Sequence, residues 1–279
     1  MDKEIRLIGV FDSGIGGLTV FKELNRKLPE MRIVYLGDTA RVPYGVKSKE
    51  TVVRYSMEAA RFLTRKGVDL IVVACNTSSA LAMDQLRKSF DIPIIGVIEA
   101  GARRACGLTR SKRIGVIGTH ATVKSEAYRN EIQKIMPGAD VRQLACPLFV
   151  PLVEEGWTDN KIARNIAEVY LDELKRADVD TLILGCTHYP LLKKTIAEVM
   201  GAGVKLIDSA ESIADDVWQM LYGSEKREEG GQIKNSLQSF SEPELRFYVT
   251  DSTERFIEVG SVFLGFEIRN PQIVDITGE

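Results

Sequence analysis

Two short stretches of the sequence decide the fold: LIVVACNT at residues 70–77 and LILGCTH at residues 182–188. Each is a nearly continuous apolar run, which is typical of a parallel strand covered on both faces. Each run ends in a cysteine, Cys75 or Cys186, followed by Asn76 or Thr187, residues that can cap a helix. We therefore expect each thiol to lie where a buried strand ends and a helix begins.

A second pair of strands repeats in the same way, with IGVF at residues 8–11 and IGVI at residues 114–117. The offset is 106 residues between Ile8 and Ile114, and 111 residues between Cys75 and Cys186. One such pair could reflect the likeness of any two buried strands. Two pairs at nearly equal offset indicate an internal duplication.

Apolar strands alternate with amphipathic helices along the chain, which predicts an α/β fold with mainly parallel sheets and helices on both faces. The chain has 279 residues, a length that favours two domains. We predict strands at 6–11, 32–36, 69–74, 92–97, 113–118 and 204–207, and helices at 17–28, 48–66, 77–90 and 212–221. Residues 223–242 are charged and polar and predict a poorly ordered surface excursion. Apolar alternation resumes at 247–249 and 256–266, and this tail should pack back on the first domain.

Composition excludes several classes of protein. Lys and Arg total 37 against 39 for Asp and Glu, a net charge of −2 that does not suit a nucleic-acid binder. The apolar runs are too short to span a bilayer, and the N-terminus has no signal-peptide core, so we expect a cytoplasmic protein that binds no membrane. We expect it to assemble as a homodimer.

The four cysteines are Cys75, Cys106, Cys146 and Cys186, and none form a C-x-x-C pair. In a reducing cytosol we expect no disulfide, and with 2 histidines in the chain we expect no metal site. Cys106 and Cys146 lack partners of the same kind and are interpreted as structural. Cys75 and Cys186 are the reactive candidates, because a helix N-terminus lowers a thiol pKa and ligands of α/β sheets bind at the carboxyl ends of strands.

Two further side chains could assist these thiols. Asp12 lies in the turn DSGIGG at residues 12–17, and His188 follows Cys186 closely. The turn is not a dinucleotide fingerprint, because Thr19 stands where the third glycine is required. Asp12 could be an acid/base helper or a simple turn cap, and His188 a proton shuttle or an ordinary polar residue. By themselves, Glu154 and the Pro43-Tyr44-Gly45 turn are typical of loops.

Three motifs together carry a family resemblance: FDSGIGG at 11–17, ACNT at 74–77 and GCTHYP at 185–190. They strongly resemble bacterial glutamate racemases, and the likeness extends from Gly9 to about Tyr222. The resemblance implies two α/β domains with the active site in the cleft between them. It places the first domain at residues 1–98 plus 209–279 and the second at 99–208. It also implies D-glutamate production for peptidoglycan without pyridoxal phosphate, metal or other cofactor.

The resemblance also assigns residues to roles. The family's catalytic cysteines match Cys75 and Cys186, and its further acid/base carboxylate matches Glu154; Asp12 and His188 complete the predicted catalytic set. The predicted substrate contacts are Asp12, Ser13, Pro43, Tyr44, Gly45, Asn76, Thr77, Thr119, Thr187 and His188. Nothing is transferred to the region after Gly223.

The mechanism we predict is a proton exchange between two thiols. Cys75 takes the α-proton of D-glutamate while Cys186 protonates the other face, and the roles reverse for L-glutamate. Hydroxyl, amide and N–H donors around the α-carboxylate would stabilise the developing charge. They are expected from Ser13, Asn76, Thr77, Thr119 and Thr187.

Three alternatives remain open at this point. A racemase of aspartate or of a hydantoin could use the same paired thiols. A cysteine hydrolase could use Cys186 activated by His188, although Cys75 would then be unexplained. A non-catalytic amino-acid-binding protein would also suit two lobes around a cleft.

Overall fold

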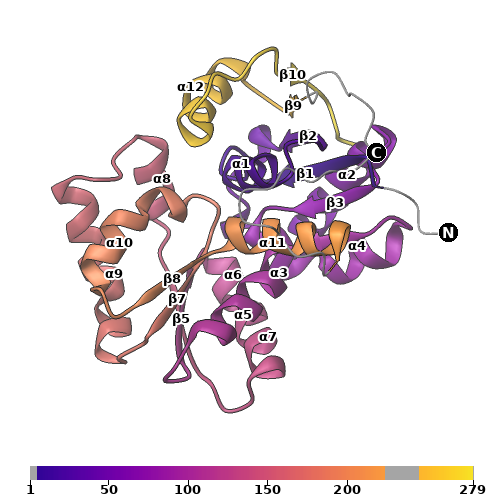
Figure 1. The fold of residues 1–279 in the computed structure, drawn as a ribbon. Helices are drawn as coiled ribbons and strands as arrows, with labels where there is room; N and C mark the ends of the chain where they lie inside the picture. The colour runs from indigo at the N-terminus through magenta and orange to yellow at the C-terminus, as the bar shows by residue number, and fades with distance from the viewer. Residues whose placement is uncertain (1–4, 224–244, 279) are drawn as a thin grey trace.

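The computed structural model describes residues 5–223 and 245–278, which form two parallel β-sheets with helices packed around them (Figure 1). The first sheet has six strands in the order β10-β9-β2-β1-β3-β4, and the second has four in the order β6-β5-β7-β8. The strands of the first sheet are β1 (Leu7–Asp12), β2 (Arg32–Gly37), β3 (Leu70–Val73), β4 (Ile94–Gly96), β9 (Leu245–Val249) and β10 (Gln272–Ile273). Those of the second are β5 (Arg113–Gly118), β6 (Asp140–Ala145), β7 (Thr181–Gly185) and β8 (Lys205–Asp208).

The two sheets share one strand order, because β2-β1-β3-β4 corresponds to β6-β5-β7-β8. The repeated IGV segments occupy the same place in each: Ile8 pairs with Leu70, and Ile114 pairs with Thr181. The predicted α/β class with two related halves is confirmed. The domain boundaries at 98/99 and 208/209 stay a prediction.

The helices cover both faces of both sheets. They are α1 (Leu18–Lys27), α2 (Lys49–Arg65), α3 (Asn76–Leu81), α4 (Met83–Ser89), α5 (Val97–Leu108), α6 (His120–Lys124), α7 (Ala127–Ile135), α8 (Phe149–Glu154), α9 (Lys161–Arg176), α10 (Lys193–Met200), α11 (Ser209–Tyr222) and α12 (Thr253–Leu264). Short 3₁₀ turns lie at η1 (Thr39–Arg41), η2 (Tyr44–Val46) and η3 (Tyr189–Leu192). The apolar side chains of α1, α11 and α12 pack on one face of the first sheet, and those of α2 and α4 on the other.

Local sequence explains most of these boundaries. Helix α2 begins after Ser48, whose hydroxyl accepts the Thr51 N–H at 3.3 Å, as the capping residues predict. The helix predicted at 77–90 is broken in two at Ala82, where φ is −113°. Hydrogen bonds continue across this bend, from the Ala82 N–H to Ser78 and from the Leu86 N–H to Ala82. The bend turns α4 so that Met83 and Leu86 are buried against the first sheet.

The C-terminal tail returns to the first sheet, as predicted. Strand β9 pairs in parallel with β2, and β10 pairs with β9. The segment predicted to alternate at 256–266 is instead mainly helix α12, capped by the Ser252 hydroxyl, which accepts the Arg255 N–H at 3.4 Å. Most of the polar stretch predicted at 223–242 lies outside the described residues.

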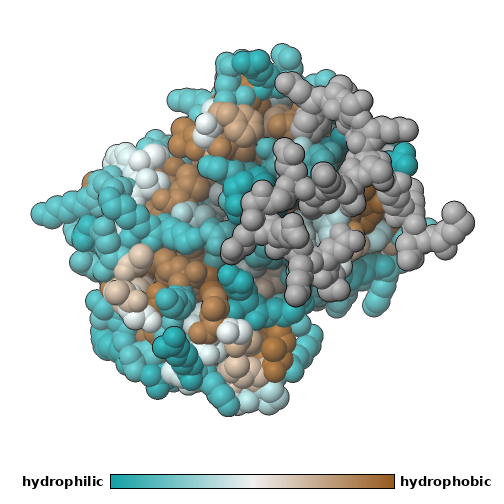
Figure 2. Space-filling model, viewed as in Figure 1, coloured by the Kyte–Doolittle hydropathy of each residue, from teal (hydrophilic) through white to brown (hydrophobic). Residues whose placement is uncertain are grey.

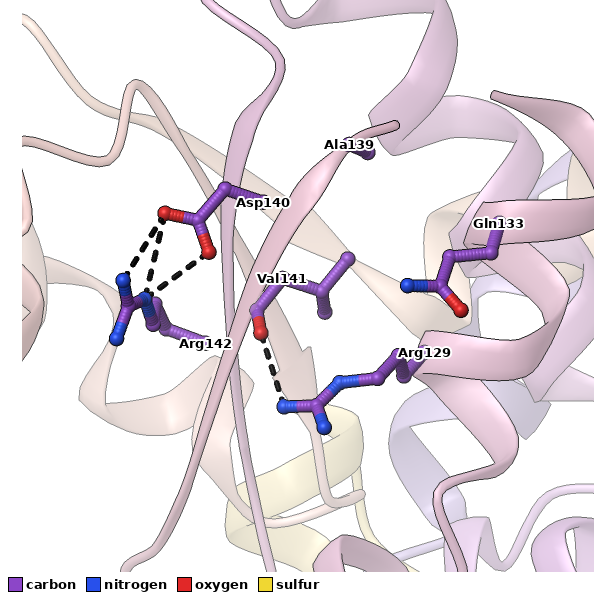
Figure 3. A pocket seen from close by; sticks show the side chains of 6 residues that line it. All are labelled: Arg129, Gln133, Ala139, Asp140, Val141 and Arg142. Carbon is purple, nitrogen blue, oxygen red and sulfur yellow. Dashed lines mark hydrogen bonds and ion pairs between the residues drawn. The ribbon is translucent and has the colours of Figure 1, made fainter. Parts of the chain in front are cut away.

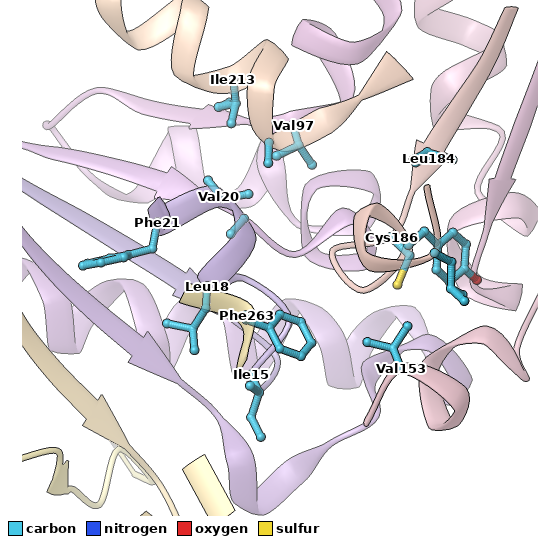
Figure 4. Close-up of a cluster of buried hydrophobic side chains, with 14 of the residues drawn as sticks. Ile15, Leu18, Val20, Phe21, Val97, Val153, Leu184, Cys186, Ile213 and Phe263 are labelled. Atoms are coloured by element: carbon cyan, nitrogen blue, oxygen red, sulfur yellow. The ribbon is translucent and has the colours of Figure 1, made fainter. Parts of the chain in front are cut away.

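One hydrophobic cluster joins the two sheets (Figure 4). Leu18 and Phe21 of α1 belong to it together with Leu184 of β7, Ile213 of α11 and Phe263 of α12. The halves of the molecule therefore share a core at their junction. Among the described helices, none is long and apolar enough to cross a membrane, and hydrophilic side chains cover much of the face in Figure 2.

Candidate active site

The two candidate thiols lie at equivalent places in the two sheets. Cys75 comes two residues after β3, and Cys186 follows β7 directly. Both thiols are free and buried, with 5% and 6% of the residue exposed. The carboxyl end of each sheet thus presents one cysteine, as the duplicated sequence predicts.

The residues that cap the helices after the two cysteines differ from the predicted Asn76 and Thr187. Cys75 itself is the N-cap of α3, and its Sγ accepts the Ser78 N–H at 3.5 Å. Asn76 is the first helical residue, and Thr187 caps no helix, because His188 precedes η3. Cys75 takes the cap position because it keeps an extended backbone (φ −64°, ψ 118°) immediately before the first helical residue.

Burial overturns the expected effect of the helix on Cys75. Loss of solvent, together with the negative charge of Asp12, raises the pKa of the Cys75 thiol to about 11. Hydrogen bonds from Ser78 and Ser13 act in the opposite direction but do not offset the burial. The resting thiol is therefore protonated at neutral pH, and a neighbouring base must take its proton before it can react.

Cys186 is linked to a histidine and a carboxylate. Its Sγ lies 3.9 Å from Nδ1 of His188, and Nε2 of His188 lies 3.0 Å from Oε1 of Glu154. Burial disfavours the imidazolium, but the hydrogen bonds and charges of Cys186 and Glu154 raise the pKa of His188 to about 10. The hydrogen bond with His188 lowers the pKa of Glu154. A protonated imidazole thus lies beside the second sulfur.

Asp12 connects the two halves of the site. Its Oδ2 accepts the Gly14 N–H at 3.0 Å, and its Oδ1 lies 3.5 Å from the Thr187 hydroxyl. Burial raises the pKa of Asp12, while the charge of His188 and the N–H groups of its own turn lower it. Because Asp12 acts electrostatically on both Cys75 and His188, the two cysteine clusters belong to one network.

The contact between Asp12 and Thr187 is possible because the backbone at Gly16 lies very close to the side chains of Thr187 and His188. A Cβ added there would lie 2.4 Å from the Thr187 Oγ1 and 2.5 Å from the His188 Nδ1. The Thr19 hydroxyl also donates to the Thr187 carbonyl at 3.1 Å. The turn after β1 therefore packs directly against the turn after β7.

Hydroxyl groups line the other side of the junction. Oγ1 of Thr77 lies 3.0 Å from that of Thr119 and 3.3 Å from that of Thr122. The Asn76 Oδ1 accepts the Tyr128 hydroxyl at 2.7 Å. The predicted contact residues Asn76, Thr77 and Thr119 are thus brought together, and each bond links α3, which follows β3 of the first sheet, to a segment that follows β5 of the second sheet.

The Pro43-Tyr44-Gly45 turn also reaches this junction. The Tyr44 ring is buried and packs with Cys75, and its hydroxyl donates to Asp38. A Cβ added at Gly45 would lie 2.5 Å from the Thr119 Cβ. Pro43 itself is exposed and precedes η2.

A separate pocket lies away from these residues (Figure 3). It has a volume of about 300 Å³ and is lined by Arg129, Gln133, Ala139, Asp140, Val141 and Arg142. None of the predicted site residues lines it. Its guanidinium groups are already engaged, Arg129 with the Val141 carbonyl and Arg142 with Asp140.

Sequence reasoning missed four residues of the site. Thr122 and Tyr128 contact predicted residues from α6 and α7. Arg255 lies 3.8 Å from Glu154, and the Phe263 ring meets His188 edge-on at 5.6 Å. No motif marks them, because they reach the site only through the packing of α6, α7 and α12.

The fold is that of a known class of enzyme. The family model for Asp/Glu/Hydantoin racemases matches residues 8–217. The chain therefore belongs to the Asp/Glu/Hydantoin racemase family and is an isomerase.

Within this family, the proteins most informative for comparison are glutamate racemases. A glutamate racemase of Geobacter metallireducens is 50% identical over 274 residues, covering 98% of both chains. The crystal structure of glutamate racemase isoform RacE1 of Bacillus anthracis has a TM-score of 0.89 at 37% identity, covering 98% of both chains. That of the Francisella tularensis enzyme, in complex with D-glutamate, has a TM-score of 0.87 at 40% identity and covers 98% of this chain and 99% of that one.

Proposed function

We propose that this chain interconverts L- and D-glutamate by a two-thiol mechanism and supplies D-glutamate for peptidoglycan synthesis. The observation that carries the proposal is the placement of Cys75 and Cys186 at equivalent strand ends. Asp12, which acts electrostatically on Cys75, accepts a hydrogen bond from Thr187, the residue after Cys186. The relatives named above are glutamate racemases, and the Francisella tularensis structure contains D-glutamate, which supports glutamate as the substrate.

The first step in the D-to-L direction requires a thiolate at Cys75. We assign Asp12 as the group that accepts the thiol proton, because its charge acts on Cys75 and burial raises the pKa of Asp12 in the direction that a base requires. Neutralising Asp12 in this way removes the negative charge that disfavours the thiolate. The Cys75 thiolate then takes the α-proton of D-glutamate.

The second step returns a proton from the opposite face. The Cys186 thiol donates it, and the protonated His188 stabilises the thiolate that remains. His188 or solvent restores the thiol before the next turnover. In the L-to-D direction Cys186 is the base and Cys75 the acid, so one site serves both enantiomers.

The carbanion needs electrostatic stabilisation, because the α-proton of an amino acid is very weakly acidic. Ser13, Asn76, Thr77, Thr119 and Thr187 are the proposed donors around the α-carboxylate, and Pro43, Tyr44 and Gly45 shape the wall beside Cys75. Several of these groups lie in a buried junction, where fixed dipoles act more strongly than in water. The homodimer, the cytoplasmic location and the domain boundaries at 98/99 and 208/209 belong to the same proposal.

A circular-dichroism time course tests the function. We expect L-glutamate to lose its optical signal without added cofactor, and in deuterium oxide each inversion places deuterium on the α-carbon. Cys75→Ser and Cys186→Ser should each lower kcat by about 10³-fold or more, because each removes an acid/base group. Cys106→Ser is the matched control and should retain activity, since Cys106 lies on α5 away from the network.

Three outcomes would contradict the proposal in whole or in part. Racemisation that survives either substitution at the unsubstituted rate would eliminate the two-thiol scheme. Turnover of aspartate or a hydantoin in place of glutamate would keep the mechanism and change the substrate. An acyl-enzyme seen by mass spectrometry would instead favour the cysteine hydrolase.

A further inference from the structure

Tyr128 on α7 lies between the two cysteine segments although it belongs to neither. It is fully buried, and its ring fills the space left by two glycines. A Cβ at Gly185 would lie 3.0 Å from the ring, and one at Gly101 would lie 3.2 Å from it. Gly185 immediately precedes Cys186, so the ring is held directly against the second cysteine segment.

The hydroxyl of Tyr128 reaches the first cysteine segment. It donates to the Asn76 Oδ1 at 2.7 Å, and Asn76 immediately follows Cys75. Burial, together with the charges of Cys186 and Asp208, raises the pKa of Tyr128. The hydroxyl therefore stays protonated at working pH and keeps its role as a donor.

This bond determines which way the Asn76 amide faces. An amide has one acceptor end and one donor end, and the acceptor end is occupied by Tyr128. Across the residues that the structure describes, the donor Nδ2 has no hydrogen-bond partner, although only 2% of Asn76 is exposed. A buried donor without an acceptor is rare and costly, which points to a ligand that supplies one.

We propose that Tyr128 is a positioning residue that fixes the Asn76 amide so that its Nδ2 donates to a carboxylate oxygen of the substrate. This inference rests on the proposed function for the substrate and adds a residue outside the predicted site. Because Asn76 and Tyr128 come from opposite halves of the molecule, the bond also ties carboxylate binding to the correct packing of the two sheets.

A double-mutant cycle tests the inference, with steady-state kinetics on both enantiomers of glutamate. Tyr128→Phe keeps the ring and removes the hydroxyl, and should raise KM about tenfold while kcat changes less than about threefold, as expected for one lost hydrogen bond. Asn76→Ala should raise KM at least as much. The double variant should be no worse than Asn76→Ala alone, because Tyr128 acts through Asn76.

Tyr248→Phe is the matched control, since Tyr248 is also buried but lies on β9 against Phe62. It should leave KM unchanged. A KM for Tyr128→Phe within twofold of the unsubstituted value, or additive effects in the double variant, would overturn the inference. Unsubstituted protein that fails to racemise glutamate would contradict the proposed function instead.

A second measurement avoids any variant of Tyr128. In ¹⁵N-labelled protein, the side-chain amide signals of Asn76, assigned by their loss in Asn76→Ala, should shift when D-glutamate is added. Signals that stay in place at saturating D-glutamate would also overturn the inference.

Discussion

At the scale of single residues, the His188–Glu154 pair determines the electrostatics around Cys186. The two side chains are 3.0 Å apart, and Arg255 approaches the second oxygen of Glu154 at 3.8 Å. Burial alone would keep the imidazole neutral, so its high pKa depends on the carboxylate and the sulfur that contact it.

Removing the carboxylate charge should therefore lower the pKa of His188. In the unsubstituted protein the pKa of His188 is raised to about 10. Glu154→Gln should lower this pKa by about one unit or more, because the neutral amide no longer stabilises the imidazolium. The chain has 2 histidines, so a proton NMR titration can assign each ring with one His120 variant. Glu155→Gln is the control, since Glu155 does not contact His188. An unchanged His188 titration in Glu154→Gln would contradict this account.

The same pair predicts how stability depends on pH. The folded pKa of His188 is raised, so its contribution is complete below the unfolded value near 6.5 and is lost as pH rises through about 10. The folded pKa of Glu154 is lowered, so its contribution is present above its ordinary value near 4.5 and is lost at lower pH. Both contributions are complete between the ordinary pKa of Glu154, near 4.5, and the unfolded pKa of His188, near 6.5. Glu154→Gln should therefore lower the free energy of unfolding most in this pH range, which denaturant unfolding at several pH values would measure.

At the scale of elements, the site is made of turns at the carboxyl ends of strands. Strand positions follow from apolar runs in the sequence, so the positions of Cys75 and Cys186 were predictable. The cap on α3 was not, because whether Cys75 or Asn76 is the N-cap depends on one pair of backbone angles. The pKa of Cys75 was not predictable either, since burial depends on how the two sheets pack.

The turn after β1 offers the sharpest test at this scale. Gly16→Ala would place a Cβ 2.4 Å from the Thr187 Oγ1 and 2.5 Å from the His188 Nδ1, so these two side chains would have to move. Misplacing the groups around Cys186 by about 1 Å should lower kcat by about 10²-fold. Gly107→Ala is the matched control, because a Cβ there meets nothing within 4 Å. Kinetics equal to those of the control would mean that the two turns need not touch.

At the scale of the whole molecule, the duplication was visible in the sequence and the junction was not. Matched offsets predicted two related sheets, which the shared strand order confirms. Contacts such as that between Thr77 and Thr119 join segments that follow strands of different sheets, and they follow no sequence period. The family resemblance pointed to Thr119 as a substrate contact. Tyr128 and Phe263 lie in no recognisable motif, so only the folded structure shows that they belong to the site.

The shared core predicts that both sheets unfold together. Leu18, Leu184 and Ile213 belong to one cluster, so opening either sheet exposes apolar surface of the other. Ile132 belongs to a different cluster, which lies against the second sheet. Ile132→Ala should lower the free energy of unfolding by about 2–5 kcal/mol. If the molecule unfolds cooperatively, both sheets should be destabilised by this amount.

Hydrogen exchange followed by mass spectrometry measures this coupling. In Ile132→Ala, the opening free energies of peptides from β1 and β5 should fall by the same amount, and Val169→Ala, at an exposed position, should change neither. A loss confined to β5 would show two independently stable halves. In that case the alignment of Cys75 with Cys186 would depend on the substrate rather than on the core, because no shared free energy would hold the two strand ends together.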